Sequence, residues 1–156
     1  MKKFLVALLI AVLIPVFAYG AAGTATLTSQ RVSIEGVVVR KIITISWTGG
    51  TAGEAGTVPS TTITAATYDL TGWYLYSAET NPGTTPSADY DIVINDADGV
   101  DLAAGLLANR SASATQLVNI GTSAYGYPVV RGNLTFVLSN NTEASSTGTL
   151  VLVFIQ

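Results

Sequence analysis

Residues 36–47 read Gly36-Val-Val-Val-Arg-Lys-Ile-Ile-Thr-Ile-Ser-Trp47, a run dominated by β-branched side chains. Such side chains fit the pleated surface of a sheet, so this run predicts a long β-strand. Four further segments alternate between apolar and polar residues, the pattern of a strand with one buried face: 72–79, 89–95, 134–139 and 149–155. These five segments together predict an all-β chain.

Weaker strand patterns cover 25–33, 61–67, 100–104 and 116–120, while residues 102–113 favour a loop or one short helical turn. Asp98-Gly99 indicates a hairpin turn, and residues 140–148 are expected to join the last two strands as an antiparallel pair. We therefore predict an all-β fold, an antiparallel β-sandwich resembling a jelly roll, with eight or nine short strands. A barrel is the alternative, and residues 21–156 are expected to form a single domain.

The chain starts with a segment that has the layout of a secretory signal peptide. Lys2 and Lys3 form a basic start, residues 4–17 are apolar, and Ala18-Tyr19-Gly20 places small residues at the positions that a signal peptidase reads. We expect this segment to direct export of the domain to the periplasm, the cell surface or the medium, and to be cleaved after Gly20. A retained hydrophobic arm is the alternative, although Pro15 and the shortness of the run argue against a permanent transmembrane helix.

Charged side chains are sparse and mostly acidic. Beyond residue 20, five basic residues stand against ten acidic ones, a net charge of −5. This balance lacks the basic footprint of proteins that bind nucleic acids or anionic lipid surfaces. We therefore expect no nucleic-acid partner and, once the leader is removed, no lasting membrane association.

The chain contains neither cysteine nor histidine. This excludes disulfides, Ser-His-Asp triads, Cys-His dyads and histidine metal sites. Lys41 is the one lysine beyond the leader, and it lies within a predicted strand without an SxxK motif. We accordingly predict that the protein is not an enzyme and needs no cofactor, with calcium as the one ion to consider.

The densest polar cluster lies within residues 89–101. Its carboxylates around the glycine turn, Asp96, Asp98 and Asp101, are candidate calcium ligands, because calcium takes several hard oxygen donors. The EF-hand pattern is absent, and the alternative is a turn whose aspartates accept hydrogen bonds from their own backbone. With Asp89 and Asp91, these residues are also the candidates for an acid–base pair, but that chemistry needs a cleft and a raised pKa.

The aromatic residues form a second candidate surface. Tyr74 and Tyr76 are expected on one face of the 72–79 strand together with Ala78, opposite Trp73 and Leu75. They are candidates for a platform that stacks against sugar rings, with further members in Trp47, Trp73, Tyr125 and Tyr127. The alternative is ordinary packing, with some rings in the core and others at its rim.

Several segments beyond residue 57 share a common resemblance. They read Gly72-Trp-Tyr-Leu-Tyr-Ser-Ala-Glu-Thr-Asn-Pro-Gly83, Tyr90-Asp-Ile-Val-Ile-Asn-Asp-Ala-Asp-Gly-Val-Asp101, Leu107-Ala-Asn-Arg-Ser111 and Gly132-Asn-Leu-Thr-Phe-Val-Leu-Ser-Asn-Asn-Thr142. Over residues 57–156 the chain resembles small structural proteins of tailed phages and prophages. The resemblance implies a β-rich component of the virion head, neck or tail, without catalytic residues.

Two functions therefore remain open. The first is a structural or assembly protein of phage type that acts through protein contacts, with a homo-oligomer as its expected form and the virion as its location. The second is an exported bacterial surface or periplasmic β-domain that binds a partner or a glycan, for which the leader and the tyrosines argue. The leader does not fit the first function, because phage structural proteins normally assemble in the cytoplasm.

Overall fold

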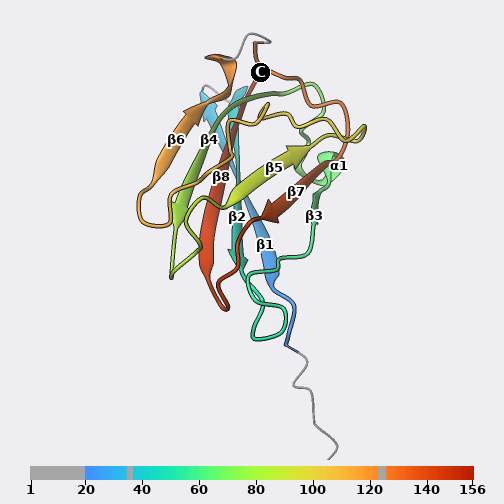
Figure 1. Ribbon diagram of the computed structural model, residues 1–156. Helices are drawn as coiled ribbons and strands as arrows, with labels where there is room; N and C mark the ends of the chain where they lie inside the picture. The colour runs from blue at the N-terminus through green and yellow to red at the C-terminus, as the bar shows by residue number, and fades with distance from the viewer. Residues whose placement is uncertain (1–19, 35–36, 123–125) are drawn as a thin grey trace, which may run out of the picture.

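The computed structural model describes residues 20–34, 37–122 and 126–156, which fold into two antiparallel sheets (Figure 1). The five-stranded sheet has the order β1-β2-β8-β4-β6, formed by β1 (Thr24–Ile34), β2 (Val37–Thr48), β8 (Thr147–Ile155), β4 (Tyr74–Pro82) and β6 (Gln116–Asn119). The three-stranded sheet has the order β3-β7-β5, formed by β3 (Thr61–Ile63), β7 (Leu134–Ser139) and β5 (Asp91–Asn95). Two short helical turns accompany them, α1 (Ala65–Tyr68) and η1 (Ile120–Thr122). The all-β prediction is confirmed.

The strands pair in a nested order. β2 pairs with β8, β3 with β7 and β4 with β6. Each successive pair therefore joins two strands that lie closer together in the sequence than the pair before. The segment 101–110 continues this order beside β5, where the Leu102 N–H donates to the Ile94 carbonyl at 2.9 Å and the Arg110 N–H donates to the Tyr90 carbonyl at 2.7 Å. β1 lies outside the nested set, as an additional strand beyond β2.

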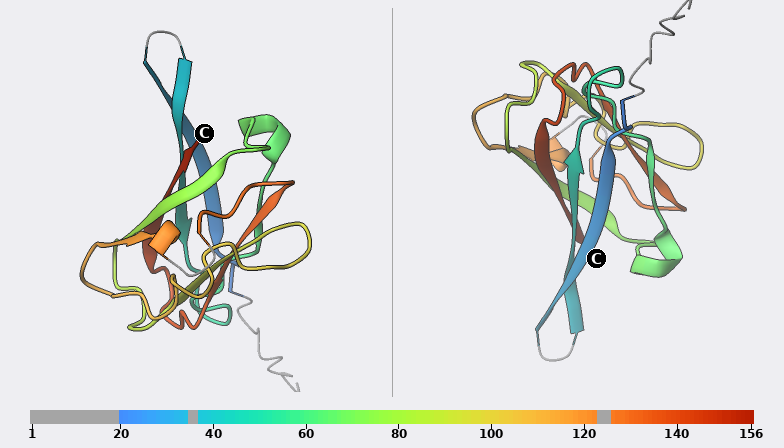
Figure 2. Two further views of the ribbon diagram at one scale, coloured as in Figure 1. Left: turned by 90° about the horizontal axis from the view of Figure 1, so that it is seen from above. Right: turned by 90° about the horizontal axis from the view of Figure 1, so that it is seen from below.

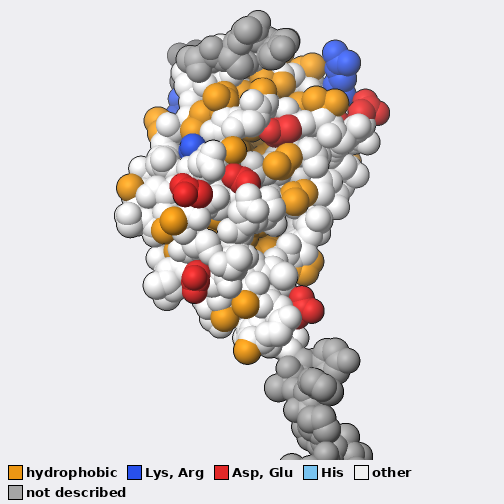
Figure 3. All heavy atoms as spheres, in the orientation of Figure 1, with side chains coloured by type: hydrophobic (Ala, Val, Ile, Leu, Met, Phe, Trp, Pro, Cys, Tyr) orange, Lys and Arg blue, Asp and Glu red, His pale blue; other side chains and the backbone are white. Residues whose placement is uncertain are grey.

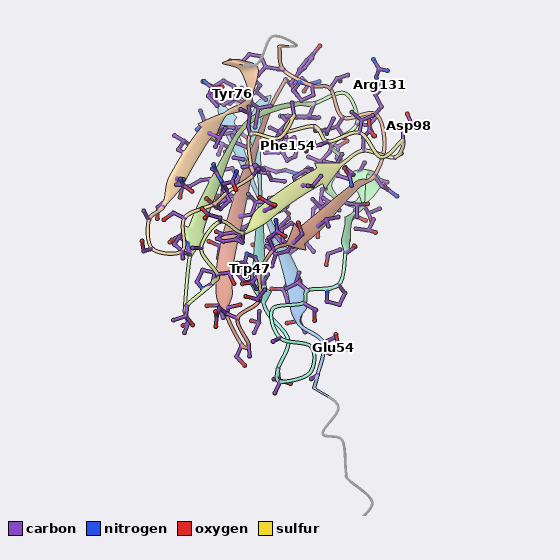
Figure 4. All side chains as sticks on the ribbon, viewed as in Figure 1. Trp47, Glu54, Tyr76, Asp98, Arg131 and Phe154 are labelled. Carbon is purple, nitrogen blue, oxygen red and sulfur yellow. The ribbon has the colours of Figure 1, made fainter. Side chains whose placement is uncertain are left out.

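Both sheets contribute to one hydrophobic core. Alternate residues of the central strands β2 and β8 point into it, and they are buried while their neighbours are not: Ile43, Ile45, Trp47, Leu150, Leu152 and Phe154. The opposing sheet supplies Ile63, Ile92, Ile94, Leu134 and Phe136. Trp47 and Phe154 are labelled in Figure 4. The period-two pattern read from the sequence therefore gives each of these strands one core-facing side.

The indole ring of Trp47 lies directly over Gly148, its partner residue across the β2–β8 ladder. A Cβ atom on Gly148 would come within 2.4 Å of the ring. The ring also packs against Tyr90 in an edge-to-face arrangement, with 5.7 Å between the ring centroids. Glycine at this position thus makes room for one of the two tryptophans of the core.

Three predicted strand features are wrong in detail. The 61–67 strand ends at Ile63, since Ala65 begins α1 and its N–H is held by the Asn133 side chain at 2.9 Å. The 100–104 strand is reduced to one bridge between Asn95 and Asp101. The last two strands do not pair with each other, because β7 and β8 belong to different sheets.

The connection from β7 to β8 is held in place by a buried side chain. Asn141 donates to the Gly56 carbonyl at 3.0 Å and to the Ser146 hydroxyl at 2.8 Å. These bonds hold the connection where it crosses from one sheet to the other.

An irregularity in β4 changes its expected face pattern. The register against β8 shifts between Leu75 and Ser77, so Tyr76 has no partner in that ladder. As a result Leu75 and Ala78 both face the core, each with no exposed surface, although strict alternation places Ala78 on the side of Tyr74.

The predicted leader, residues 1–20, lies outside the described residues apart from Gly20, so its cleavage stays a prediction. Among the described residues, no helix is long and apolar enough to cross a membrane.

We expect Gly148→Ala to lower the free energy of unfolding by about 1–3 kcal/mol, because the added methyl group overlaps the Trp47 ring and forces the core apart. Gly132→Ala is the matched control, since the nearest atom to its new Cβ is 3.5 Å away, at Ala97. Urea denaturation of both variants measures the difference. Equal stabilities would contradict the close packing of Trp47 on Gly148.

Candidate functional site

The acidic turn after β5 is held by its own carboxylates. One oxygen of Asp96 accepts hydrogen bonds from the backbone N–H groups of Asp98 and Val100, each at 2.9 Å. Gly99 completes the turn with φ at +81°, a conformation that glycine adopts without strain. The Asp98-Gly99 turn is therefore present as predicted, stabilised by the Asp96 side chain.

Asp101 plays the same role for the segment that follows. One carboxylate oxygen accepts from the N–H groups of Ile94, at 3.3 Å, and Ala103, at 3.0 Å. The other accepts from the Gly105 N–H at 2.7 Å. Both oxygens are thus bonded to the backbone, and they organise the irregular segment that runs beside β5.

For Asp96 and Asp101, these contacts are those of the alternative to calcium binding, in which the aspartates accept hydrogen bonds from nearby backbone N–H groups. Within residues 20–34, 37–122 and 126–156, no group of three or more acidic side chains is arranged to hold a metal ion. Calcium binding by Asp96, Asp98 and Asp101 stays a prediction. Measuring the melting temperature at increasing calcium concentrations tests it, because an ion that binds only the native form raises that temperature.

The two remaining acidic candidates, Asp91 and Asp89, are placed differently. Asp91 accepts from the Asn109 N–H at 2.8 Å and pairs with the side-chain amide of Asn140, which ties β5 to the loop after β7. Asp89 is exposed and adopts a positive φ of 60° just before β5 begins. On the face shown in Figure 3, acidic side chains are spread among uncharged ones.

The tyrosines of β4 lie at the end of the five-stranded sheet near η1. Tyr76 stacks on Tyr127, with 5.3 Å between ring centroids and 29° between the planes. Tyr74 and Tyr127 are about two-fifths exposed, at 43% and 40%. The structure therefore places Tyr76 in a stacked pair whose second ring, Tyr127, comes from a loop far along the chain.

The other rings of the predicted platform are placed differently. Trp47 and Trp73 are buried, so they belong to the core and the platform prediction is wrong for them. Tyr125 lies outside the described residues. The described part of the platform is therefore Tyr74, Tyr76 and Tyr127.

A buried lysine is the most unusual charged group of the described residues. Lys41, 2% exposed, lies on the core side of β2 and donates to the carboxylate of Asp69 at 2.7 Å and to the Asp69 carbonyl. Its ammonium group sits 4.1 Å from the centre of the Trp73 ring. The sequence pattern gave no sign of this partnership, because Asp69 is 28 residues away, in the turn that ends α1.

This ion pair is structural in its chemistry. The hydrogen bond and the positive charge of Lys41 lower the pKa of the Asp69 carboxyl below its ordinary value of 3.8, and Arg31 adds a weaker effect in the same direction. A lysine amine does not readily attack an ionised carboxylate to form an amide bond. The contact between Lys41 and Asp69 is therefore a salt bridge. It pins α1 to the end of the five-stranded sheet.

A shallow groove of about 320 Å³ opens at the opposite end of that sheet. Hydroxyl and amide side chains from three neighbouring strands line it: Ser46, Thr48, Asn81, Thr147 and Thr149. Trp47 and Gly148 also contribute to the lining. The groove offers hydrogen-bonding groups, and none of the described residues that line it has an ionisable side chain.

We expect Asp101→Ala to cost about 2 kcal/mol of stability, because it removes the acceptor of three backbone N–H groups. Asp98→Ala is the matched control, since the backbone of Asp98 takes part in the turn through its N–H group. Thermal unfolding of both variants measures the effect. An unchanged melting temperature for Asp101→Ala would show that its bonds do not organise this segment.

The Lys41–Asp69 pair predicts a pH dependence. Because folding lowers the pKa of Asp69, the pair stabilises the native state above pH 3.8 and loses that contribution as the pH falls through the lowered pKa. Asp69→Asn should therefore be less stable than the unchanged protein at neutral pH, with the difference shrinking in acid. Denaturation at a series of pH values measures it, with the exposed Glu143→Gln as control for loss of charge alone. A difference independent of pH would contradict the pair.

The chain was compared with protein-family models, with curated proteins and with solved structures, and none of the three comparisons gave a match. The resemblance to phage structural proteins stays an expectation from the sequence.

Proposed function

We propose that this chain is a non-enzymatic structural protein that acts through protein–protein contacts, built on a jelly-roll β-sandwich. The nested pairing of β2 with β8, β3 with β7, β4 with β6 and β5 with residues 101–110 supports this architecture, because a jelly roll is a long antiparallel hairpin wrapped into two sheets. Jelly rolls occur in viral capsid and lectin domains, so the fold is compatible with both functions that the sequence leaves open.

The observation that carries the structural role is the outer strand β1. It spans Thr24–Ile34, eleven residues, and among the described residues it pairs with β2 on one side and with no strand on the other. Natural proteins usually protect exposed sheet edges with short strands, prolines or charged side chains. β1 contains no proline and one charged residue, Arg31, so it presents a long row of backbone groups suited to pairing with another chain.

The other sheet edges are protected. β6 spans four residues and β3 three, and the far side of β5 is covered by the 101–110 segment. The long open edge is therefore confined to one strand that stands outside the nested framework. This selective exposure supports a strand whose role is contact with a partner.

The proposal includes the phage-type virion component that the sequence resembles, located in the head, neck or tail. The predicted leader instead supports export, and in that case the same framework would serve at the cell surface or in the periplasm. A homo-oligomer is the expected form in either setting.

A glycan-binding surface domain is the second candidate. The stacked pair of Tyr76 and Tyr127, with Tyr74 exposed beside it on β4, supports this role, because sugar rings pack well on exposed aromatic faces. The hydroxyl-lined groove lies at the other end of the sheet and would form a separate contact.

One pair of measurements separates the two functions. For a structural protein we expect light scattering to give a mass above that of one chain, and mass spectrometry to find the chain in particles or fibres purified from the producing cells. For the second function we expect binding on a glycan array that disappears in Tyr76→Ala and persists in Leu117→Ala, an exposed apolar residue of β6. A monomer that is absent from every assembly would overturn the structural proposal.

A further inference from the structure

We propose that β1 pairs antiparallel with β1 of a second copy of this chain, about a two-fold axis through Ser29, to form one continuous ten-stranded sheet. This inference deepens the proposed structural function and rests on it. It names the partner surface and the register of the contact.

The chemistry of the edge selects the partner. In a strand, the N–H and C=O groups of alternate residues point to opposite sides, so half of the backbone groups of β1 point away from β2. Among the described residues, no other segment pairs with β1, which stands first in the order of its sheet. Only another extended strand satisfies such a row of alternating donors and acceptors in full.

The geometry of the hairpin leaves this edge accessible. β8 pairs with β2 only as far as Arg40, whereas β1 continues to pair with β2 up to Val37. The β1–β2 hairpin therefore extends beyond the rest of the sheet (Figure 2). A second strand can approach it without meeting the body of the domain at that end.

The side chains of β1 suit pairing with an identical strand. A two-fold axis perpendicular to the sheet keeps the core-facing sides of both copies on the same side, so odd-numbered residues oppose odd-numbered ones. With the axis at Ser29, all eleven residues of β1 overlap, and Thr24 opposes Ile34 of the second copy.

This register also avoids a charge clash. Arg31 is the sole charged residue of β1, and it falls opposite Leu27 of the second copy instead of opposite its own counterpart. Leu27 is half-buried at the margin of the core, where the aliphatic stem of an arginine can cover it. The remaining facing residues are mostly threonine, serine and glutamine, which are uncharged.

A contact between β1 and another sheet edge of the second copy would give hydrogen-bond partners to fewer backbone N–H and C=O groups. β6 would match four residues and β3 three, against eleven for β1 with itself. The self-pairing therefore satisfies the most backbone groups and produces a closed dimer, which can act as the unit of a larger assembly.

Cysteine crosslinking tests the register directly, because the chain has no cysteine of its own and every disulfide must join two copies. In the full chain as recovered from cells, Ser29→Cys lies next to its own counterpart across the axis. We expect it to crosslink under mild oxidation in high yield, with Ser113→Cys, in an exposed loop, as the control. Crosslinking at Ser29 no greater than at Ser113 would overturn the inference.

A charge pair provides an independent measurement. Ser29→Lys places two like charges face to face, and we expect the dimer dissociation constant to rise about fivefold. Mixing Ser29→Lys with Ser29→Glu should restore a heterodimer at least as stable as the original dimer. Circular dichroism shows that each variant is folded, and Ser113→Lys controls for added charge.

The outcomes distinguish this inference from the broader proposal. A chain found in particles or fibres that dimerises without Ser29 crosslinking would keep its structural function and lose the β1 contact. A β1 dimer that never occurs in any assembly would keep the contact and overturn the structural function. Pairing through β6 would appear as crosslinking of Leu117→Cys in place of Ser29→Cys.

Discussion

The pairing of β2 with β8 is the constraint on which the rest of the structure depends. It joins the first strand of the nested framework to the last, from Arg40 with Ile155 to Thr48 with Thr147. Their core-facing residues, Trp47 and Phe154 among them, are buried at the centre of the molecule. Because these strands are about a hundred residues apart in the chain, this ladder closes a long loop. The conformational entropy lost on closing that loop is offset by the extensive burial of apolar side chains.

Once that ladder is in place, the position of β1 follows. β8 occupies one side of β2, so β1 can pair only on the other side, and the nested set offers it no second neighbour. Two residues separate β1 from β2 in the chain, so their pairing is local and costs little loop-closure entropy. The framework therefore leaves an open strand at its border, which contributes the partly buried Ala25 and Leu27 to the margin of the core.

The strand content was predictable from the sequence, because alternation directly reports which face of a strand is buried. β2, β5, β7 and β8 lie where β-branched and alternating segments predict them. The pairing of β8 with β2 and β4, in place of β7, was not predictable, since it depends on tertiary contacts such as those of Asn141. The contacts of Lys41 with Asp69 and of Tyr76 with Tyr127 were not predictable for the same reason, because each joins residues far apart in the chain.

The acidic turn shows why residue type alone is a weak guide to function in this chain. Asp96 and Asp101 attract attention as carboxylates, yet their oxygens are engaged by backbone N–H groups that the irregular segment beside β5 would otherwise leave without partners. In β1 the situation is reversed, because threonines and serines line a strand whose outer backbone groups have no partner strand within the part of the chain that the structure describes. Side chains thus satisfy the backbone of the irregular segment, whereas an unpaired strand edge is itself the group that another strand would recognise, which is the basis of the proposed β1 contact.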